Sequence, residues 1–113
     1  MSTLYVLSTG ALSNQQVAEA KKVLGVWEIV PAPSHVYNTW NNPIKKQMDT
    51  EILQDYLYPV FEWVDSFHPK ARFVIEGDDS ISTFLVVSKA LKKVRCFATN
   101  HVGGFREYPN PIT

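Results

Sequence analysis

The sequence predicts an α/β protein with a mostly parallel, Rossmann-like sheet and helices on both faces. Three observations lead to this prediction. Short apolar runs alternate with longer segments of helical periodicity along the 113-residue chain. The connections between them are short, and several carry a glycine or a helix N-cap residue. A regular β-α alternation of this kind produces a parallel sheet covered by helices.

Each element has its own signal. The expected strands are the apolar runs at residues 3–7, 26–30, 71–76 and 95–99. The expected helices are residues 14–24, a short one within 34–42, a long one from 49 or 50 to 67, and 81–94. Ser13 and Gln16 have the spacing of a capping box, and Gly25 is a helix stop. Pro59 predicts a kink or a division of the long helix. Residues 1–102 are expected to form one domain, and residues 103–113 a loose tail.

Composition narrows the function classes. The formal net charge is zero, whereas proteins that hold DNA or RNA through the backbone usually carry a basic excess. A small anionic ligand needs only a few local donors and stays possible. The single cysteine, Cys96, rules out an internal disulfide and is expected to be buried. No secretory signal and no apolar run of membrane-spanning length is visible, which predicts a cytoplasmic protein that binds no membrane. The histidines lack close metal-ligand spacing, so no metal and no cofactor is expected.

The fold predicts where a ligand binds. In open parallel sheets, ligands bind beyond the carboxyl ends of the strands, where helix N-termini point. Three loops follow expected strands in this way, at residues 8–12, 77–82 and 100–106. These loops are therefore the candidate site.

The strongest candidate is the turn after the third strand. It contains Gly77, Asp78, Asp79, Ser80, Ser82 and Thr83. The glycine allows close approach of backbone to a ligand, and the following helix N-terminus and the hydroxyls can hold a phosphate or a ribose. Two carboxylates repel phosphate, so one is expected to cap the helix, while the other could accept from a ribose hydroxyl or an adenine amine. The alternative is that both acids only cap and solvate the turn.

The other two loops offer weaker signals. Ser8, Thr9 and Gly10 could cradle an anion, or could form a plain βα turn. Thr99, Asn100 and His101 end the last strand, and His101 could act as a general acid or base, donate to phosphate, or be a solvated loop residue. Arg106 follows a Gly-Gly pair, which suggests either an arginine that folds over an anionic ligand or a disordered tail.

An ordered set of segments suggests a family. The segments are Ser8 with L-S-x-x-Q at 12–16, A-K-K-V-L-G-V at 20–26, Y-L-Y-P-V-F-E-W-V at 56–64, F-V-I-E-G-D at 73–78 with T-F-L-V-V at 83–87, and F-A-T at 97–99. In this combination the chain resembles the small stand-alone CARF-like accessory proteins of type III CRISPR systems. That group includes ring nucleases, which degrade cyclic oligoadenylate.

The resemblance implies a homodimer that binds cyclic tetra-adenylate and cleaves it without a metal. A ribose 2′-OH attacks its adjacent phosphate, leaving a 2′,3′-cyclic phosphate. The groups it assigns to catalysis are Ser8, Thr9, Ser80 and His101. The groups it assigns to ligand binding are Gly10, Gly77, Asp78, Asp79, Ser82, Thr83, Thr99, Asn100 and Arg106.

Two positions depart from the family pattern, and two other functions stay open. Relatives often carry histidine where Thr9 stands, and a bulky residue followed by glycine where Asp79 and Ser80 stand. These departures favour the alternative of a non-catalytic binder of the same ligand. A third possibility is an interaction domain whose dimer face, built from tryptophan and tyrosine residues, serves a protein partner.

Overall fold

The structure, a computed structural model, describes residues 3–67, 71–99 and 104–109. The strands in chain order are β1 (Thr3–Leu7), β2 (Glu28–Pro31), β3 (Arg72–Ile75), β4 (Arg95–Thr99) and β5 (Phe105–Glu107). The helices are α1 (Asn14–Glu19), the π-helical turn η1 (Ala20–Leu24), α2 (Ser34–Asn41), the 3₁₀ turn η2 (Pro43–Gln47), α3 (Thr50–Tyr56), α4 (Tyr58–Asp65) and α5 (Ser80–Ala90). The predicted α/β class is confirmed.

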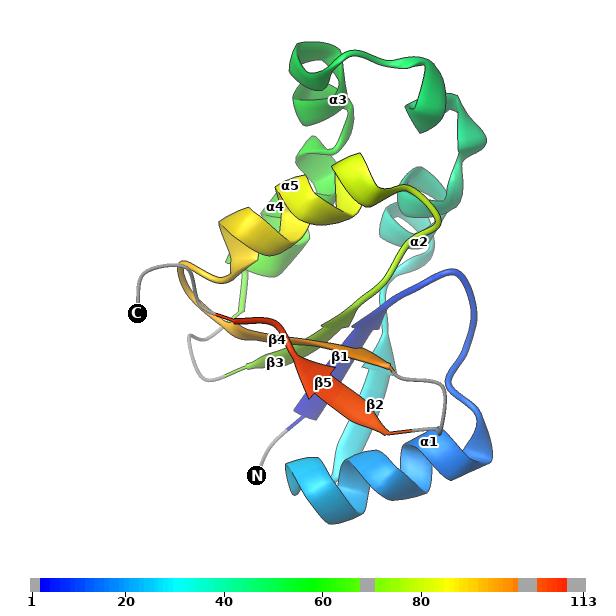
Figure 1. Cartoon of the computed structure of the whole chain (residues 1–113), viewed down its shortest axis with the longest axis vertical. Helices are drawn as coiled ribbons and strands as arrows, with labels where there is room; N and C mark the ends of the chain where they lie inside the picture. The colour runs from blue at the N-terminus through cyan, green and yellow to red at the C-terminus, as the bar shows by residue number, and fades with distance from the viewer. Residues whose placement is uncertain (1–2, 68–70, 100–103, 110–113) are drawn as a thin grey trace.

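The sheet is Rossmann-like and mostly parallel. Its strand order is β2-β1-β3-β4-β5, and only β5 runs antiparallel to its neighbour. Helix α1 lies under one face, while α2, α4 and α5 lie over the other (Figure 1). Helices therefore cover both faces, as the alternation of elements predicts.

Alternation along the strands divides the core in two. Leu7, Phe73 and Ile75 join the larger core, which includes the buried side chains of α2, α4 and α5. Leu4 and Val6 face the other way and pack with Ala20 of η1. The period of two along β1 explains this division, since consecutive side chains of a strand point to opposite faces.

The predicted helix signals are confirmed in their details. The Ser13 side chain accepts from the Gln16 backbone at 3.1 Å, and the Gln16 side chain accepts from the Ser13 N–H at 2.8 Å. Gly25 follows η1 with φ +68°, a left-handed conformation that glycine adopts without strain. The helix is not uniform, because its second half is π-helical. Pro59 lies in the first turn of α4, so the expected long helix is divided into α3 and α4.

Several boundaries differ from the predictions. Strand β2 begins at Glu28 rather than Val26, because its pairing with β1 starts at Thr3↔Glu28. Helix α5 ends at Ala90 rather than Val94. The Ala90 carbonyl accepts hydrogen bonds from the N–H groups of Lys93 and Val94 in the turn that follows. Residues 105–107 form β5, so the prediction of a loose tail is wrong for them.

Strand β5 is fastened to the sheet by side chains as well as by its ladder. The Tyr108 hydroxyl donates to the Ile75 carbonyl at 2.9 Å, and the Tyr108 N–H donates to the Cys96 carbonyl at 2.9 Å. Arg95 donates two hydrogen bonds to Glu107, at 2.7 and 2.9 Å. The glycines and prolines of this segment predict a loose tail. The hydrogen-bond partners that hold it on the sheet are distant in the sequence.

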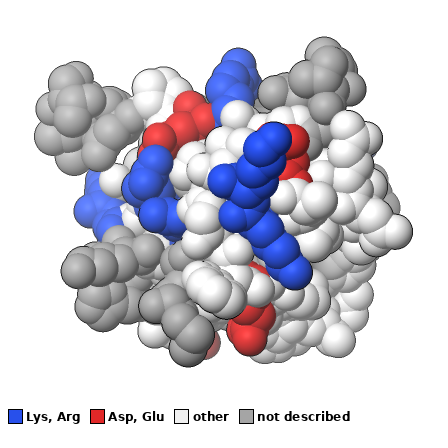
Figure 2. All heavy atoms as spheres, turned by 90° about the horizontal axis from the view of Figure 1, so that it is seen from below, with Lys and Arg blue, Asp and Glu red and all other residues white. Residues whose placement is uncertain are grey.

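Within the three described segments, no helix combines the length and apolar character that crossing a bilayer requires. Figure 2 shows the end of the molecule on which α1 lies, where blue and red side chains are interspersed with uncharged ones. The described atoms on this face form no continuous basic surface. The chain as a whole has a formal net charge of zero.

Candidate functional site

The candidate site lies where the connections of two neighbouring strands diverge. Strands β1 and β3 are adjacent and parallel, and the Glu76 N–H donates to the Leu7 carbonyl at 2.9 Å. From here β1 leads to α1 on one face, and β3 leads to α5 on the other (Figure 1). This is the topological switch point at which open α/β sheets bind ligands.

The loop after β1 is open but internally bonded. The Ser8 hydroxyl donates to the Gly10 carbonyl, and Ser8 is 8% exposed. Tyr37 donates from its hydroxyl to the Thr9 carbonyl at 3.2 Å, and Asn41 donates to the Ser8 carbonyl at 3.1 Å. Thr9 and Gly10 are exposed. The Ser8 hydroxyl is therefore engaged within the loop, whereas the Thr9 side chain faces solvent.

The turn after β3 is closed by its own hydrogen bonds. Asp79 caps α5 by accepting from the Ile81 N–H at 3.1 Å, which confirms that one of the two acids caps the helix. Its carbonyl accepts from the Thr83 hydroxyl at 2.8 Å and from the Ser82 hydroxyl at 3.3 Å. Of the three predicted hydroxyls in this turn, only the exposed Ser80 makes no side-chain hydrogen bond within the described residues.

Asp78 is paired with a lysine of η2. Its carboxylate lies 3.2 Å from the Lys46 ammonium, and both side chains are exposed. The hydrogen bond from Lys46 lowers the pKa of Asp78. The Lys46 ammonium therefore offsets part of the negative charge of Asp78. This reduces the repulsion of a phosphate that is expected from two carboxylates in the same turn.

Gly77 makes room for a core side chain. A Cβ at this position would lie 2.9 Å from Cζ2 of Trp40 and 2.9 Å from Oγ1 of Thr83. The sequence predicts close approach of a ligand at Gly77, and the structure adds a packing reason for a glycine here. The missing Cβ leaves space for the Trp40 indole, whose N–H donates to the Glu76 carbonyl at 2.7 Å.

A buried lysine, missed by the sequence analysis, lies behind the same turn. Lys45 is 2% exposed, and its ammonium donates to the Ser82 hydroxyl at 3.1 Å. The ammonium also lies 4.3 Å from the centre of the Trp40 ring. Burial lowers the pKa of Lys45, and the charges of Asp78 and Asp79 oppose that shift. Because Ser82 is fully buried and bonded to Lys45, its predicted role as a ligand-binding hydroxyl is not supported.

A second missed residue is Glu76, which joins β3 to β4 at the carboxyl edge. Its Oε1 accepts from the Thr99 N–H at 3.0 Å and from the Thr99 hydroxyl at 2.6 Å. Thr99 thus lies in the predicted place but is engaged with a carboxylate. In the sequence, the one signal for Glu76 is that a charged residue directly follows an apolar strand.

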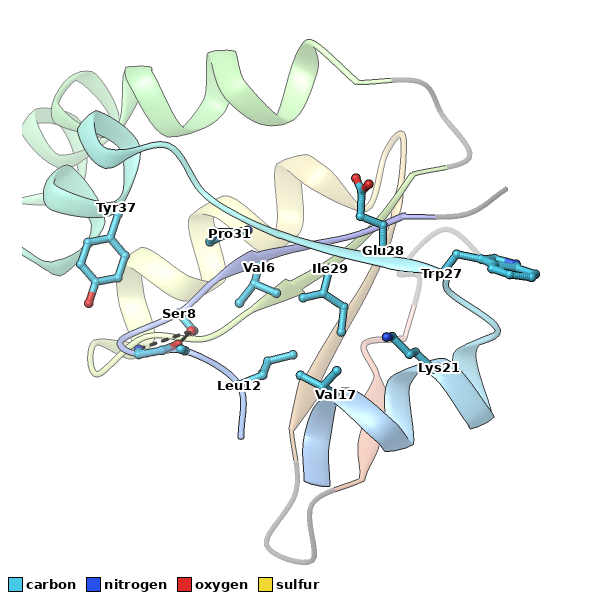
Figure 3. Close-up of a pocket in the computed structure, with 12 residues that line it drawn as sticks. Val6, Ser8, Leu12, Val17, Lys21, Trp27, Glu28, Ile29, Pro31 and Tyr37 are labelled. Atoms are coloured by element: carbon cyan, nitrogen blue, oxygen red, sulfur yellow. Dashed lines mark hydrogen bonds between the residues drawn. The ribbon is translucent and has the colours of Figure 1, made fainter. Parts of the chain in front are cut away.

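A groove opens beside the loop after β1. It has a volume of about 680 Å³. Its lining is mostly apolar and consists of Val6, Ser8, Gly10, Ala11, Leu12, Val17, Lys21, Trp27, Glu28, Ile29, Pro31 and Tyr37. Figure 3 shows Val6 and Ile29 on the strands facing Leu12 and Val17, with Tyr37 near the Ser8 end and Lys21 near the other. Ser8 and Gly10 are predicted from the sequence, but the groove is not, because its walls come from separate elements.

The remaining predicted residues are not gathered at the site by the described structure. Asn100 and His101 lie outside the described residues. Arg106 is exposed in the middle of β5, in register with Ala98, rather than on a hinge. Among the described residues, no three His, Cys, Asp or Glu side chains are grouped closely enough to hold a metal ion.

The sheet and its switch point define a Rossmann-like α/β protein with a candidate ligand site at the carboxyl edge. The model of the family described as uncharacterized protein MJ1673 matches residues 2–101, and the chain belongs to this family. No curated protein and no solved structure matches it.

Proposed function

We propose that this chain binds cyclic oligoadenylate, cyclic tetra-adenylate in particular, at the carboxyl edge of its sheet. The observation that carries the proposal is the pairing of an open loop, residues 8–12, with the capped start of α5 at the switch point. In the described structure the exposed hydroxyls of Thr9 and Ser80 belong to these two loops, and Lys46 adds a cation beside the second. Such groups suit a ligand with both phosphates and ribose hydroxyls.

The proposal includes a cytoplasmic homodimer. A two-fold symmetric ring of four adenylates matches a two-fold symmetric pair of subunits, because each half of the ring then meets identical donors. Glu76 adds a carboxylate held in place by Thr99. A carboxylate accepts from a ribose hydroxyl or an adenine amine, and it discourages a phosphate from taking the same position.

The proposed reaction is cleavage of the ring by its own ribose. The 2′-oxygen forms a bond to the adjacent phosphorus, the bond from phosphorus to the 5′-oxygen breaks, and the 5′-oxygen takes up a proton while the 2′-hydroxyl loses one. The product is linear with a 2′,3′-cyclic phosphate end. The protein's contribution is to hold the 2′-hydroxyl in line and to stabilise charge on the phosphate oxygens. We assign this work to the exposed hydroxyls of Thr9 and Ser80.

One observation favours a binder that does not cleave. The hydroxyls of Ser8, Ser82 and Thr83 already form hydrogen bonds with partners inside the protein. Fewer free donors remain to stabilise a transition state than the predicted set contains. A protein that sequesters the ring is therefore the second candidate function.

Incubation with cyclic tetra-adenylate in excess EDTA tests both candidates. We expect the wild-type chain to bind the ring, and a ring nuclease to release linear adenylates with cyclic phosphate ends. Ser80→Ala should then slow cleavage by about a hundredfold to a thousandfold, the range for loss of one transition-state donor. Ser88→Ala, on the same helix and away from the switch point, is the control. An intact ring that stays bound would favour sequestration, and absence of binding would refute the proposal.

A further inference from the structure

The groove beside the loop after β1 has a sharp division between its middle and its ends. Val6 and Ile29 form one wall, and Leu12 and Val17 form the other (Figure 3). These four side chains carry no hydrogen-bonding group. A phosphate placed between them would lose its hydration without gaining partners, so the middle of the groove rejects charged groups and accepts apolar or aromatic ones.

One end of the groove belongs to the candidate site. Ser8 and Gly10 line the groove and also form the loop at the carboxyl end of β1. Tyr37 stands at the same end, 39% exposed, with its hydroxyl on the Thr9 carbonyl. A ligand held at the carboxyl edge therefore has the mouth of an apolar groove directly beside it, with an aromatic ring at the rim.

We propose that this groove receives an adenine base of the ligand, while the phosphates stay outside on the carboxyl edge. This inference rests on the proposed function, because it assigns the base of that ligand to a place of its own. A flat, uncharged base fits between apolar walls, and a volume of about 680 Å³ lies within the usual range for small-molecule sites. An open rim leaves the ribose and phosphates in water and next to Thr9.

One charged side chain points into the far end of the groove. Lys21, from the π-helical turn η1, points inward, whereas the Glu28 carboxylate points to the opposite side of β2 (Figure 3). A π-helical turn changes the direction of side chains relative to an α-helix and is frequent at functional sites. Lys21 lies at the end of the groove away from Ser8, so the apolar middle of the groove is the part that suits a neutral base.

Helix α1 offers a matched pair of variants for a test. Val17 lines the groove and is not part of the buried core, so Val17→Glu places a carboxylate in the groove without removing a core side chain. Ala18 is exposed on the same helix and does not line the groove. Ala18→Glu therefore adds the same charge on the same helix but outside the groove. Circular dichroism of the full-length chains checks that both fold.

Calorimetric titration with cyclic tetra-adenylate, adenosine and ribose 5-phosphate separates the outcomes. We expect Val17→Glu to weaken binding of the ring and of adenosine by roughly tenfold or more, which corresponds to about 1.4 kcal/mol. Ala18→Glu should stay within about twofold of wild type, and ribose 5-phosphate should bind all three proteins alike.

Each contrary result has one meaning. If the wild type binds the ring but Val17→Glu binds it equally well, or if both variants weaken it equally, the groove is not the base site, although the proposed function stands. If adenosine binds in a Val17-dependent way but the ring does not, the groove inference stands and the cyclic ligand is refuted. If wild type binds neither the ring nor adenosine, both proposals are overturned.

Discussion

The two loops at the switch point are built in opposite ways. The loop after β1 is exposed at Thr9 and Gly10, and it borders an open groove. The turn after β3 is wedged between Trp40 and the start of α5, with the buried Lys45 behind it. Both loops contain a glycine and hydroxyl residues, and the sequence makes each of them a candidate for holding an anion. The turn after β3 is a fixed wall of the site, and the loop after β1 is its accessible side. Substitutions in the two loops should therefore change the free energy of unfolding by very different amounts.

The largest difference should come from two aromatic residues of α2. Trp40 is fully buried against the turn after β3, whereas Tyr37 is exposed beside the loop after β1. We expect Trp40→Ala to reduce the free energy of unfolding by about 3–5 kcal/mol, through the lost burial and the cavity left behind. Tyr37→Ala should cost less than about 1 kcal/mol. Urea denaturation measures both, and losses of similar size would contradict the comparison.

The two glycines give the next largest difference. An alanine at position 77 would force its Cβ against Trp40 and Thr83, while a Cβ at position 10 would meet no atom within 4 Å. Gly77→Ala should therefore destabilise the fold by about 1–3 kcal/mol, as overpacking does. Gly10→Ala should stay within about 0.5 kcal/mol of wild type. Thermal unfolding of the two variants is the measurement. Equal stability would mean that the turn after β3 is as loose as the loop after β1.

Lys45→Met should produce the smallest effect, visible as a difference in pH dependence. Burial lowers the folded-state pKa of Lys45 below its ordinary value of 10.5. Between these two pKa values the unfolded chain binds more protons, so wild-type stability gains with rising pH from this group. At lower pH both states are protonated and the cost of burying the charge is fully present.

Lys45→Met removes that titration and keeps a side chain of similar length. Relative to the variant, wild type should therefore become more stable as pH rises towards 10.5. Unfolding free energies of the two proteins across that range give the difference, in which the shared groups cancel. A difference that does not change with pH would show that the contribution of Lys45 to stability does not depend on its charge.

Much of the fold follows from local signals. The capping box at Ser13, the stop at Gly25 and the division of a helix at Pro59 each depend on residues a few positions apart. Strand β5 escaped prediction because its partners, such as Ile75 for Tyr108, are far away in the sequence. The same reason explains the site. The loops could be located from strand ends. The burial of Lys45 and the packing of Trp40 against Gly77 depend on contacts between residues that are distant in the sequence.

Strand β2 lies at one edge of the sheet and ends at Pro31. The Ala32 N–H donates to the Val6 carbonyl, so the backbone of residue 31 faces away from β1. Proline has no N–H to offer there, which leaves Ile29 as the sole outward donor of this short strand. The edge is thus poorly suited to accept another chain as an added strand. Two copies of this protein would consequently meet through side chains rather than through one continuous sheet across β2, and the same proline guards the edge against aggregation.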